Sequence, residues 1–219
     1  MRYLAPSLLS ANFYNLENDL NILSKKNIKY LHLDVMDGMF VPNISIGIPV
    51  ISSIKKNTKD TFILDTHLMI EKPERYIDNF KDAGADILTI HREISSDYLK
   101  VIDLIKDSGL KVGVSINPET DVNKIIDAID KVDLILVMSV HPGFGGQQFI
   151  ESSLEKIAFL NDLRNKNGYN YKIEVDGGIY VENVNKVINA GADIIVSGSG
   201  VFKGNISENI DRFMETFKE

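Results

Sequence analysis

The sequence predicts a single α/β domain over residues 1–219, folded as a (β/α)₈ TIM barrel. Eight short apolar segments alternate with eight segments of helical pattern, and successive strand ends lie about 27 residues apart. Strict alternation implies parallel strands joined by right-handed crossovers, and eight such units can close into a barrel. The structural alternative is an open doubly wound sheet, which is less favoured because no G-x-G-x-x-G pattern follows the first strand.

The expected strands are short apolar runs bounded by polar or turn-forming residues. Two of them begin in similar sequence, DAGADILTIH at 82–91 and NAGADIIVSGS at 189–199, so that a helix end, a turn and a strand start repeat along the chain. In chain order we expect strands at residues 3–9, 29–35, 61–69, 86–91, 111–117, 133–140, 171–175 and 193–197.

The expected helices carry apolar residues at helical spacing, as Leu16, Leu20 and Leu23 do in the first of them. Pro73 suits the first turn of the third helix, and a glycine directly follows three helices, at positions 84, 109 and 191. In chain order we expect helices at residues 15–26, 46–54, 73–83, 97–108, 122–129, 152–165, 181–190 and 206–217.

The composition excludes several classes of protein. The 219 residues are 44% hydrophobic and 25% charged, which is ordinary for a soluble globular protein. A net charge of −7 argues against nucleic-acid binding, and the absence of cysteine excludes disulfides and thiolate metal sites. No apolar run approaches the length of a membrane helix, and the N-terminus lacks a secretory pattern. We therefore expect a cytoplasmic protein that binds neither nucleic acid nor a membrane.

The segment YLHLDVMDG, residues 30–38, points to a site. Because side chains alternate along a strand, Tyr30, His32 and Asp34 lie on one face and apolar residues lie on the other. An imidazole and a carboxylate therefore project side by side from the carboxyl end of a strand, where they can share a metal ion or a proton. Asp37 lies in the turn that follows, and we expect it to be a loop residue.

Polar side chains gather at the expected carboxyl ends of the strands, which is where barrels hold their chemistry. Three of the four histidines, His32, His67 and His91, lie there. A lone strand histidine is more often a hydrogen-bonded core residue. As a set, however, His32, Asp34, His67 and Asp176 offer two imidazoles and two carboxylates, which suit one divalent ion: zinc, ferrous iron, manganese or cobalt.

Asp34 and Asp176 also suit acid–base catalysis, since their strands are expected to lie nearly opposite each other in a ring of eight. One carboxylate can remove a proton from carbon while the other returns a proton to the opposite face. A metal ion between them would polarise a carbonyl group and stabilise an enediolate.

Glycine-rich segments follow three successive strands: HPGFGGQ at 141–147, DGGI at 176–179 and SGSG at 197–200. Glycines let backbone N–H groups converge on an anion, and barrels often bind phosphate in the loops after strands 7 and 8. One glycine pair is usually a plain turn, but three at the same end of a barrel favour a phosphate site.

Three methionines, Met36, Met69 and Met138, lie at or just past strand ends. They either fill gaps in the core or form an apolar wall around the reacting carbon atoms. Arg92 and Glu93, which follow His91, read as a surface pair without a role in the site.

Six segments together resemble one known family. They are PSLLSANF (6–13), LHLDVMDGMFVPN (31–43), LDTHLMIEKP (64–73), MSVHPGFGGQ (138–147), VDGGI (175–179) and SGSGVF (197–202). The chain resembles the ribulose-phosphate 3-epimerase family from its first expected strand to its last. The resemblance implies a barrel of the ribulose-phosphate binding type, an isomerase that interconverts D-ribulose 5-phosphate and D-xylulose 5-phosphate in the pentose phosphate pathway.

The resemblance also implies residue roles. The family's metal ligands fall on His32, Asp34, His67 and Asp176, with Asp34 as proton acceptor and Asp176 as proton donor. Its apolar site wall falls on Met36, Met69 and Met138. Its substrate contacts fall on Ser7, His67, Gly143, Phe144, Gly145, Gly146, Gly177, Gly178, Gly198 and Ser199. Position 141 holds His where many members have Asn. We expect one divalent metal ion, a phosphosugar substrate, and a homo-oligomer whose size the resemblance leaves open.

Three other functions compete with this one. A 3-epimerase of a six-carbon ketose phosphate, such as D-allulose 6-phosphate, would use the same chemistry in a longer pocket. A phosphosugar lyase or decarboxylase would rely on a lysine at a strand end, and the chain places none beside Asp34 or Asp176. A phosphate-binding barrel without catalysis would not require two histidines and two carboxylates to converge.

Overall fold

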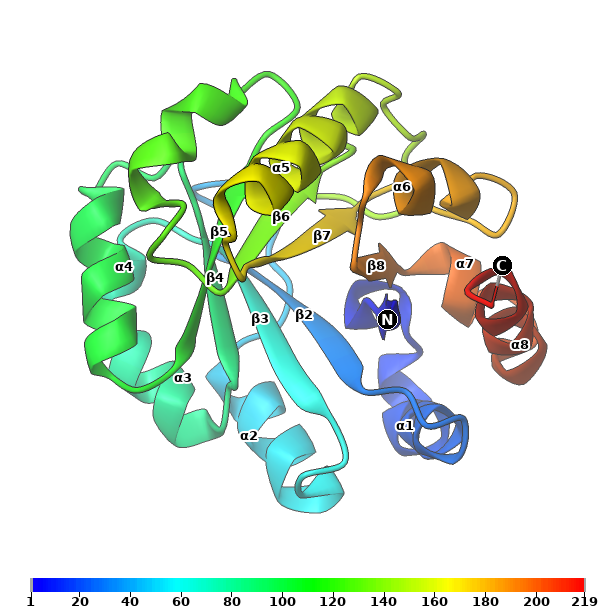
Figure 1. Cartoon of the computed structure of the whole chain (residues 1–219). Coiled ribbons are helices and arrows are strands. Elements are labelled where there is room, and N and C mark those ends of the chain that lie inside the picture. The colour runs from blue at the N-terminus through cyan, green and yellow to red at the C-terminus, as the bar shows by residue number, and fades with distance from the viewer. Residues whose placement is uncertain (1, 219) are drawn as a thin grey trace.

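Eight parallel strands surround a common centre in the computed structural model, which describes residues 2–218 (Figure 1). They are β1 (Tyr3–Pro6), β2 (Tyr30–Met36), β3 (Ile63–Met69), β4 (Ile87–His91), β5 (Lys111–Ile116), β6 (Leu134–Met138), β7 (Lys172–Asp176) and β8 (Ile194–Ser197). Hydrogen bonds join β1 to β8 and then each strand to the one before it, back to β2. A bridge between Ser7 and His32 closes the ring, which confirms the predicted barrel over the open sheet.

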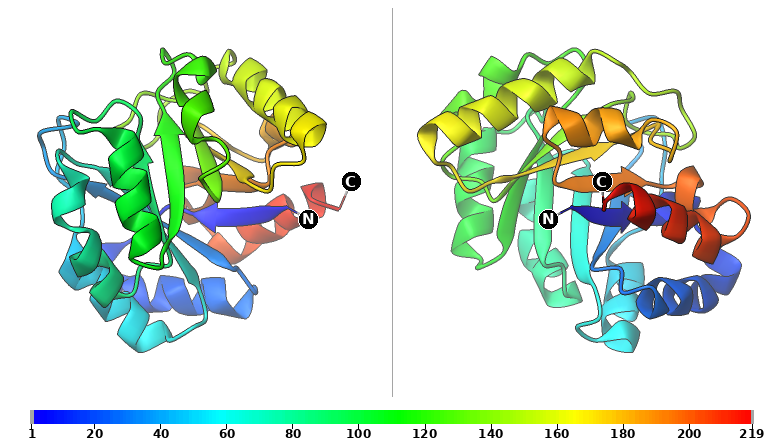
Figure 2. Two further views of the ribbon diagram at one scale, coloured as in Figure 1. Left: turned by 60° about the vertical axis from the view of Figure 1, so that its left-hand side comes forward. Right: turned by 45° about the vertical axis from the view of Figure 1, so that its right-hand side comes forward.

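Helices cover the outside of the barrel (Figures 1 and 2). The α-helices are α1 (Leu16–Lys25), α2 (Ile48–Thr58), α3 (Ile77–Ala83), α4 (Tyr98–Asp107), α5 (Ser153–Asn167), α6 (Val184–Ala190), α7 (Ser199–Phe202) and α8 (Ile206–Thr216). The 3₁₀ helices are η1 (Leu8–Ser10), η2 (Phe13–Asn15), η3 (Pro73–Arg75) and η4 (Val122–Ala128). None of the helices within residues 2–218 combines the length and the apolar character that a membrane crossing requires.

The apolar core has two main layers, and β2 contributes to both. Leu31, Leu33 and Val35 belong to the larger layer, between the strands and the helices. Tyr30 belongs to a smaller layer inside the barrel. Full burial of a leucine side chain contributes roughly 1.5–3 kcal/mol, so a slip of one residue that exchanged the two faces would be very costly. The apolar alternation thus directs His32 into the barrel.

Several element boundaries differ from the expectation by a few residues, and four differences have a local reason. The first strand ends at Pro6 because the Ser7 side chain accepts the N–H of Leu9, at 3.3 Å, and starts η1. The helix expected at 73–83 divides into η3 and α3 at Tyr76, whose φ of −122° is not helical. Residues 122–128 form a 3₁₀ helix. The helix α7 has only four residues, too few to show a period in the sequence.

The two ends of the chain meet in the closed barrel. Tyr3 of β1 lies opposite Ile194 of β8 in the sheet. Figure 2 shows α1 and α8 side by side outside these strands, and Lys26 Nζ lies 2.6 Å from Asp211 Oδ2 between them. The side chains at the carboxyl ends of the strands are therefore held in a complete ring.

Candidate active site

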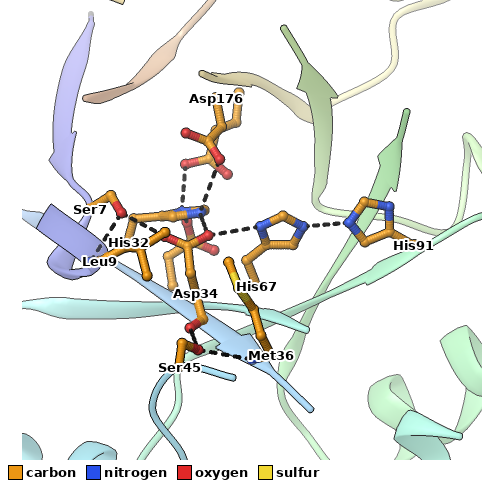
Figure 3. A network of polar contacts seen from close by, with 11 residues as sticks. Ser7, Leu9, His32, Asp34, Met36, Ser45, His67, His91 and Asp176 are labelled. Atoms are coloured by element: carbon orange, nitrogen blue, oxygen red, sulfur yellow. Dashed lines mark hydrogen bonds and ion pairs between the residues drawn. The ribbon is translucent and has the colours of Figure 1, made fainter. Parts of the chain in front are cut away.

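Two imidazoles and two carboxylates converge at the carboxyl ends of β2, β3 and β7. Each of His32, Asp34, His67 and Asp176 offers one ligand atom, and these four atoms lie within 4.8 Å of one another. Asp34 Oδ1 lies 3.4 Å from His32 Nε2 and 3.2 Å from His67 Nδ1. Asp176 Oδ2 lies 3.9 Å from His32 Nε2, and Figure 3 shows it approaching from the opposite side to Asp34. The structure brings all four predicted ligands together.

The facing atoms of this cluster are hydrogen-bond acceptors, as a cation site requires. Asp65 Oδ2 lies 2.6 Å from His32 Nδ1, so in the neutral ring Nδ1 carries the proton and Nε2 presents its lone pair to Asp34. In the part of the chain that the structure describes, His32 Nε2 is one of several buried side-chain atoms without a hydrogen-bond partner. A lone pair facing a carboxylate is unfavourable unless a proton or a metal cation lies between them. The donor set therefore fits a divalent ion.

The negative charge of the cluster attracts protons as well as cations. Burial lowers the pKa of His32, but the carboxylates of Asp34 and Asp65 outweigh burial and raise this pKa well above its usual value. Burial alone would raise the pKa of Asp34, yet the His32 and His67 imidazoles hold it well below its usual range. Ser7 Oγ also donates a hydrogen bond of 2.6 Å to Asp34 Oδ2. Asp34 is thus ionised at neutral pH.

Asp176 shows the opposite behaviour. Burial and the negative charge of Asp34 raise the pKa of Asp176 from 3.8 to about 7. Near neutral pH, one carboxyl group of the pair is therefore a base while the other can hold a proton. Two carboxyl groups whose environments separate their pKa values are suited to act as base and acid in one reaction.

A cavity opens above the cluster, between the loops that follow β1, β6, β7 and β8 and the carboxyl ends of β2 and β3. Ser7, Asp34 and Asp176 reach its wall, whereas His32 and His67 are fully buried. A contact between His67 and the substrate therefore stays a prediction. The three methionines line the cavity, as do the predicted contacts Gly143, Phe144, Gly145, Gly146, Gly177, Gly178, Gly198 and Ser199.

At two positions in the cavity wall, the backbone conformation and the close neighbours allow only glycine. At Gly177, where φ is +118°, a Cβ atom would lie 2.3 Å from Val140 Cγ2. At Gly178, where φ is +66°, it would lie 2.4 Å from the backbone nitrogen of Phe149. Because glycine has no side chain, the backbone atoms of these two residues can face the cavity directly. The first turn of α7, which begins at Ser199 in the cavity wall, adds N–H groups free of intrahelical bonds.

Some cavity residues were not predicted individually. Ser10, Gln147 and Tyr180 also line the cavity, although Ser10 and Gln147 lie within segments that carry the family resemblance. A Cβ atom at Gly198 would lie 2.5 Å from Ser10 Oγ, which explains the small residue there. His141, by contrast, is 64% exposed and pairs with Glu119 at 3.3 Å, outside the cavity wall.

The interpretation of Arg92 and Glu93 as a surface pair is wrong for Glu93. Its side chain is only 23% exposed, and its Oε2 lies 3.2 Å from Nδ1 of the buried His91. Arg92 instead donates from Nε to the carbonyl oxygen of Lys124, at 2.8 Å. The sequence could not separate these neighbours, because successive residues after a strand point in different directions.

Solved structures with the same fold include sugar-phosphate enzymes. The structure titled 3-hexulose-6-phosphate synthase from Salmonella typhimurium matches with a TM-score of 0.75 and 16% identity, over 99% of this chain and 98% of that chain. 3-Keto-L-gulonate-6-phosphate decarboxylase from Vibrio cholerae matches with a TM-score of 0.71 and 12% identity, over 99% and 97%. At such low identity these likenesses show the barrel fold alone.

Sequence similarity identifies the family. A model of the ribulose-phosphate 3 epimerase family matches residues 3–202. The ribulose-phosphate 3-epimerase of Treponema pallidum is 45% identical over 203 residues, 93% of this chain and 92% of that protein. The protein of the same name from Bacillus subtilis is 46% identical over 199 residues, 90% of this chain and 91% of that protein. This chain belongs to the ribulose-phosphate 3-epimerase family.

Proposed function

We propose that this chain interconverts D-ribulose 5-phosphate and D-xylulose 5-phosphate by removing and returning the proton at C3. The observation that carries this proposal is the placement of two carboxyl groups, Asp34 and Asp176, on opposite sides of His32 and in the wall of one cavity. Asp34 is ionised, while the pKa of Asp176 is raised to about 7. A carbon atom next to a carbonyl group inverts when its proton leaves from one face and another proton arrives on the opposite face.

His32, Asp34, His67 and Asp176 would hold one divalent ion. Two imidazoles and two carboxylates suit zinc, ferrous iron, manganese and cobalt. When bound, the ion would supply Lewis-acid polarisation of the substrate carbonyl and so increase the acidity of C3–H. The remaining steps belong to the side chains of this chain.

Asp34 accepts the C3 proton of D-ribulose 5-phosphate, and Asp176 donates a proton to the opposite face. Ser7 Oγ, 2.6 Å from Asp34 Oδ2, fixes the orientation of the accepting carboxylate. In the reverse direction the two aspartates exchange roles. Because the carboxyl groups exchange protons with water, solvent hydrogen is incorporated at C3 of the product.

The cavity wall orients the substrate for these transfers. The glycine-rich loops at 143–146 and 177–178, with Gly198 and Ser199, provide backbone N–H groups for the phosphate. Met36, Met69 and Met138 form an apolar wall beside the carboxyl groups. Such a wall excludes water that would otherwise protonate the enediolate without control of its face.

Isotope exchange in heavy water tests this function. Zinc-loaded protein is incubated with D-ribulose 5-phosphate in D₂O, and mass spectrometry and NMR follow deuterium at C3 and formation of D-xylulose 5-phosphate. We expect both for the wild type and neither for Asp34→Asn, while His141→Asn, at an exposed position outside the cavity wall, serves as a control with normal turnover. Absence of exchange in metal-replete wild type would overturn the proposal, and faster turnover of D-allulose 6-phosphate would move it to six-carbon substrates.

A further inference from the structure

A row of polar contacts leads from the cluster of four proposed ligands to Glu93, in the loop that follows β4. Asp34 Oδ1 lies 3.2 Å from His67 Nδ1, and His67 Nε2 lies 2.7 Å from His91 Nε2. Figure 3 shows Asp34, His67 and His91 in line. The row continues from His91 Nδ1 to Glu93 Oε2, at 3.2 Å. Nothing in the proposed reaction uses its outer two members.

His91 and Glu93 do not line the substrate cavity. His91 is completely buried at the end of β4, with its ring 4.8 Å from the ring of Phe40 between centroids. The pairing of β3 with β4 places its ring beside that of His67. The direct polar contact of these two residues with the proposed ligands is the one that His91 makes with His67.

The hydrogen bonds of the row have one favourable direction when both rings are neutral. A neutral imidazole has one N–H donor and one acceptor nitrogen. The Glu93 carboxylate only accepts, so His91 carries its proton on Nδ1 and accepts at Nε2. His67 must then carry its proton on Nε2, the nitrogen facing His91. The lone pair of His67 is thereby placed on Nδ1, the nitrogen that faces Asp34 and the cluster.

Glu93 is held as an ionised acceptor by its surroundings. Its Oε1 accepts the backbone N–H of Asn117, at 2.9 Å, and the hydroxyl of Thr120. Burial opposes ionisation, but the hydrogen bonds from His91, Thr120 and Asn117 hold the pKa of Glu93 below its usual value. Oε1 therefore has two donors in the loop after β5, and Oε2 is the oxygen that faces His91.

A lysine fixes the loop that provides these donors. Lys156 Nζ of α5 donates to the carbonyl oxygens of Asn117, Pro118 and Thr120, at 2.9, 2.6 and 2.7 Å. The loop after β5 is thus anchored on both sides of the groups that bind Glu93.

We propose, on the basis of the metal site proposed above, that Glu93 and His91 are positioning residues that fix the tautomer of His67 and present its Nδ1 lone pair to the metal ion. Carboxylate–histidine partners outside the ligand shell commonly orient metal-binding histidines. Here the carboxylate acts at one remove, through a second imidazole.

Glu93→Gln tests the direction of the row. Glutamine has one carbonyl oxygen, which cannot serve both Asn117 N–H and His91 Nδ1–H. If its amide N–H₂ turns toward His91, His91 must accept at Nδ1 and carry its proton on Nε2. His67 must then accept at Nε2, so that its own proton moves to Nδ1. We expect zinc affinity, measured by competition with a chelator, to fall about 10–100-fold. Thr120→Val is the matched control, because it removes a donor to Glu93 but leaves the oxygen that faces His91.

A second pair of variants separates the effect of the hydrogen-bond acceptor at position 91 from the effect of filling the space there. His91→Gln keeps an oxygen that can accept from His67 Nε2–H, whereas His91→Leu fills the space without an acceptor. We expect near wild-type zinc affinity for His91→Gln and a loss of about 10–100-fold for His91→Leu. In ¹⁵N NMR of zinc-loaded wild type, His67 should show a protonated Nε2 and His91 a protonated Nδ1.

The outcomes distinguish this inference from the metal site on which it rests. His32→Ala removes a proposed ligand and should abolish zinc binding. If His32→Ala abolishes binding but Glu93→Gln and His91→Leu keep the wild-type affinity, the positioning role is refuted and the metal site stands. If wild type and His32→Ala bind zinc equally weakly, the metal site fails and the positioning role fails with it.

Discussion

Replacement of Asp176 by asparagine is expected to stabilise the metal-free protein at pH 8 while it disables catalysis. The pKa of Asp176 rises from 3.8 to about 7 because burial and the charge of Asp34 disfavour ionisation. One pKa unit corresponds to about 1.4 kcal/mol, so above pH 7 the folded state is destabilised by roughly 4 kcal/mol relative to a freely ionising carboxyl. The side chain is 16% exposed, and with solvent screening we expect about 2–4 kcal/mol.

The pH dependence has a definite sign. Below pH 3.8 the carboxyl group is protonated in both the folded and the unfolded chain, so its raised pKa has no cost there. The cost grows as the pH rises toward 7 and is complete above it. Asparagine has nearly the same shape and never ionises. The stability advantage of Asp176→Asn should therefore be close to zero near pH 4 and largest at pH 8.

Urea unfolding with EDTA present, followed by circular dichroism at pH 4, 6 and 8, measures this difference. Asp37→Asn is the matched control, because burial opposes but the backbone N–H groups of Phe40, Glu71 and Met39 hold the pKa of Asp37 below its usual value. That variant should lose stability at pH 8. The reasoning is refuted if Asp176→Asn is no more stable than wild type at pH 8, or if its advantage is the same at pH 4. Turnover by Asp176→Asn should fall by about 10²–10⁴-fold.

Three further outcomes are expected. Gly178→Ala should raise the KM for the phosphosugar and lower the Tm, since its Cβ would lie 2.4 Å from the backbone nitrogen of Phe149. Its control is Gly168→Ala, which has a similar φ of +69° and open space around it, and whose free energy of unfolding should fall by only about 1 kcal/mol from backbone strain. Ser7→Ala should lower kcat/KM about 10–100-fold in a coupled assay, because a hydrogen bond to a charged group contributes about 1.5–3 kcal/mol; an unchanged rate would contradict its role beside Asp34. Zinc should raise the Tm of wild type but not of Asp34→Asn, and equal shifts would argue against ligation by Asp34.

The convergence of the four cluster residues could be predicted because two simple rules act together. The alternation of Leu31, Leu33 and Val35 directs His32 and Asp34 into the barrel, and parallel strands of a barrel end at one rim. Neither rule requires a distance or an angle. The sequence therefore predicts which side chains meet at the carboxyl end of the barrel, even where the predicted strand boundaries differ by a few residues.

The partnership of His91 with Glu93 could not be predicted in the same way. It depends on the register between β3 and β4, on the ring orientation of His67, and on a loop that turns Glu93 back toward the barrel. No periodic pattern in the sequence encodes these three features. The same holds for Lys156, whose three carbonyl partners lie 36 to 39 residues away along the chain.

Closure of the ring by β1 and β8 has a consequence for the order of folding. The paired residues of β1 lie opposite β8, as Tyr3 does with Ile194 near the far end of the chain, whereas its contact with β2 is a single bridge between Ser7 and His32. During synthesis, the β2–β3 pair can form early and bring His32, Asp34 and His67 together, but Asp176 emerges much later. A nascent chain therefore holds an incomplete donor set, and tight metal capture should be a late event that reports completion of the barrel.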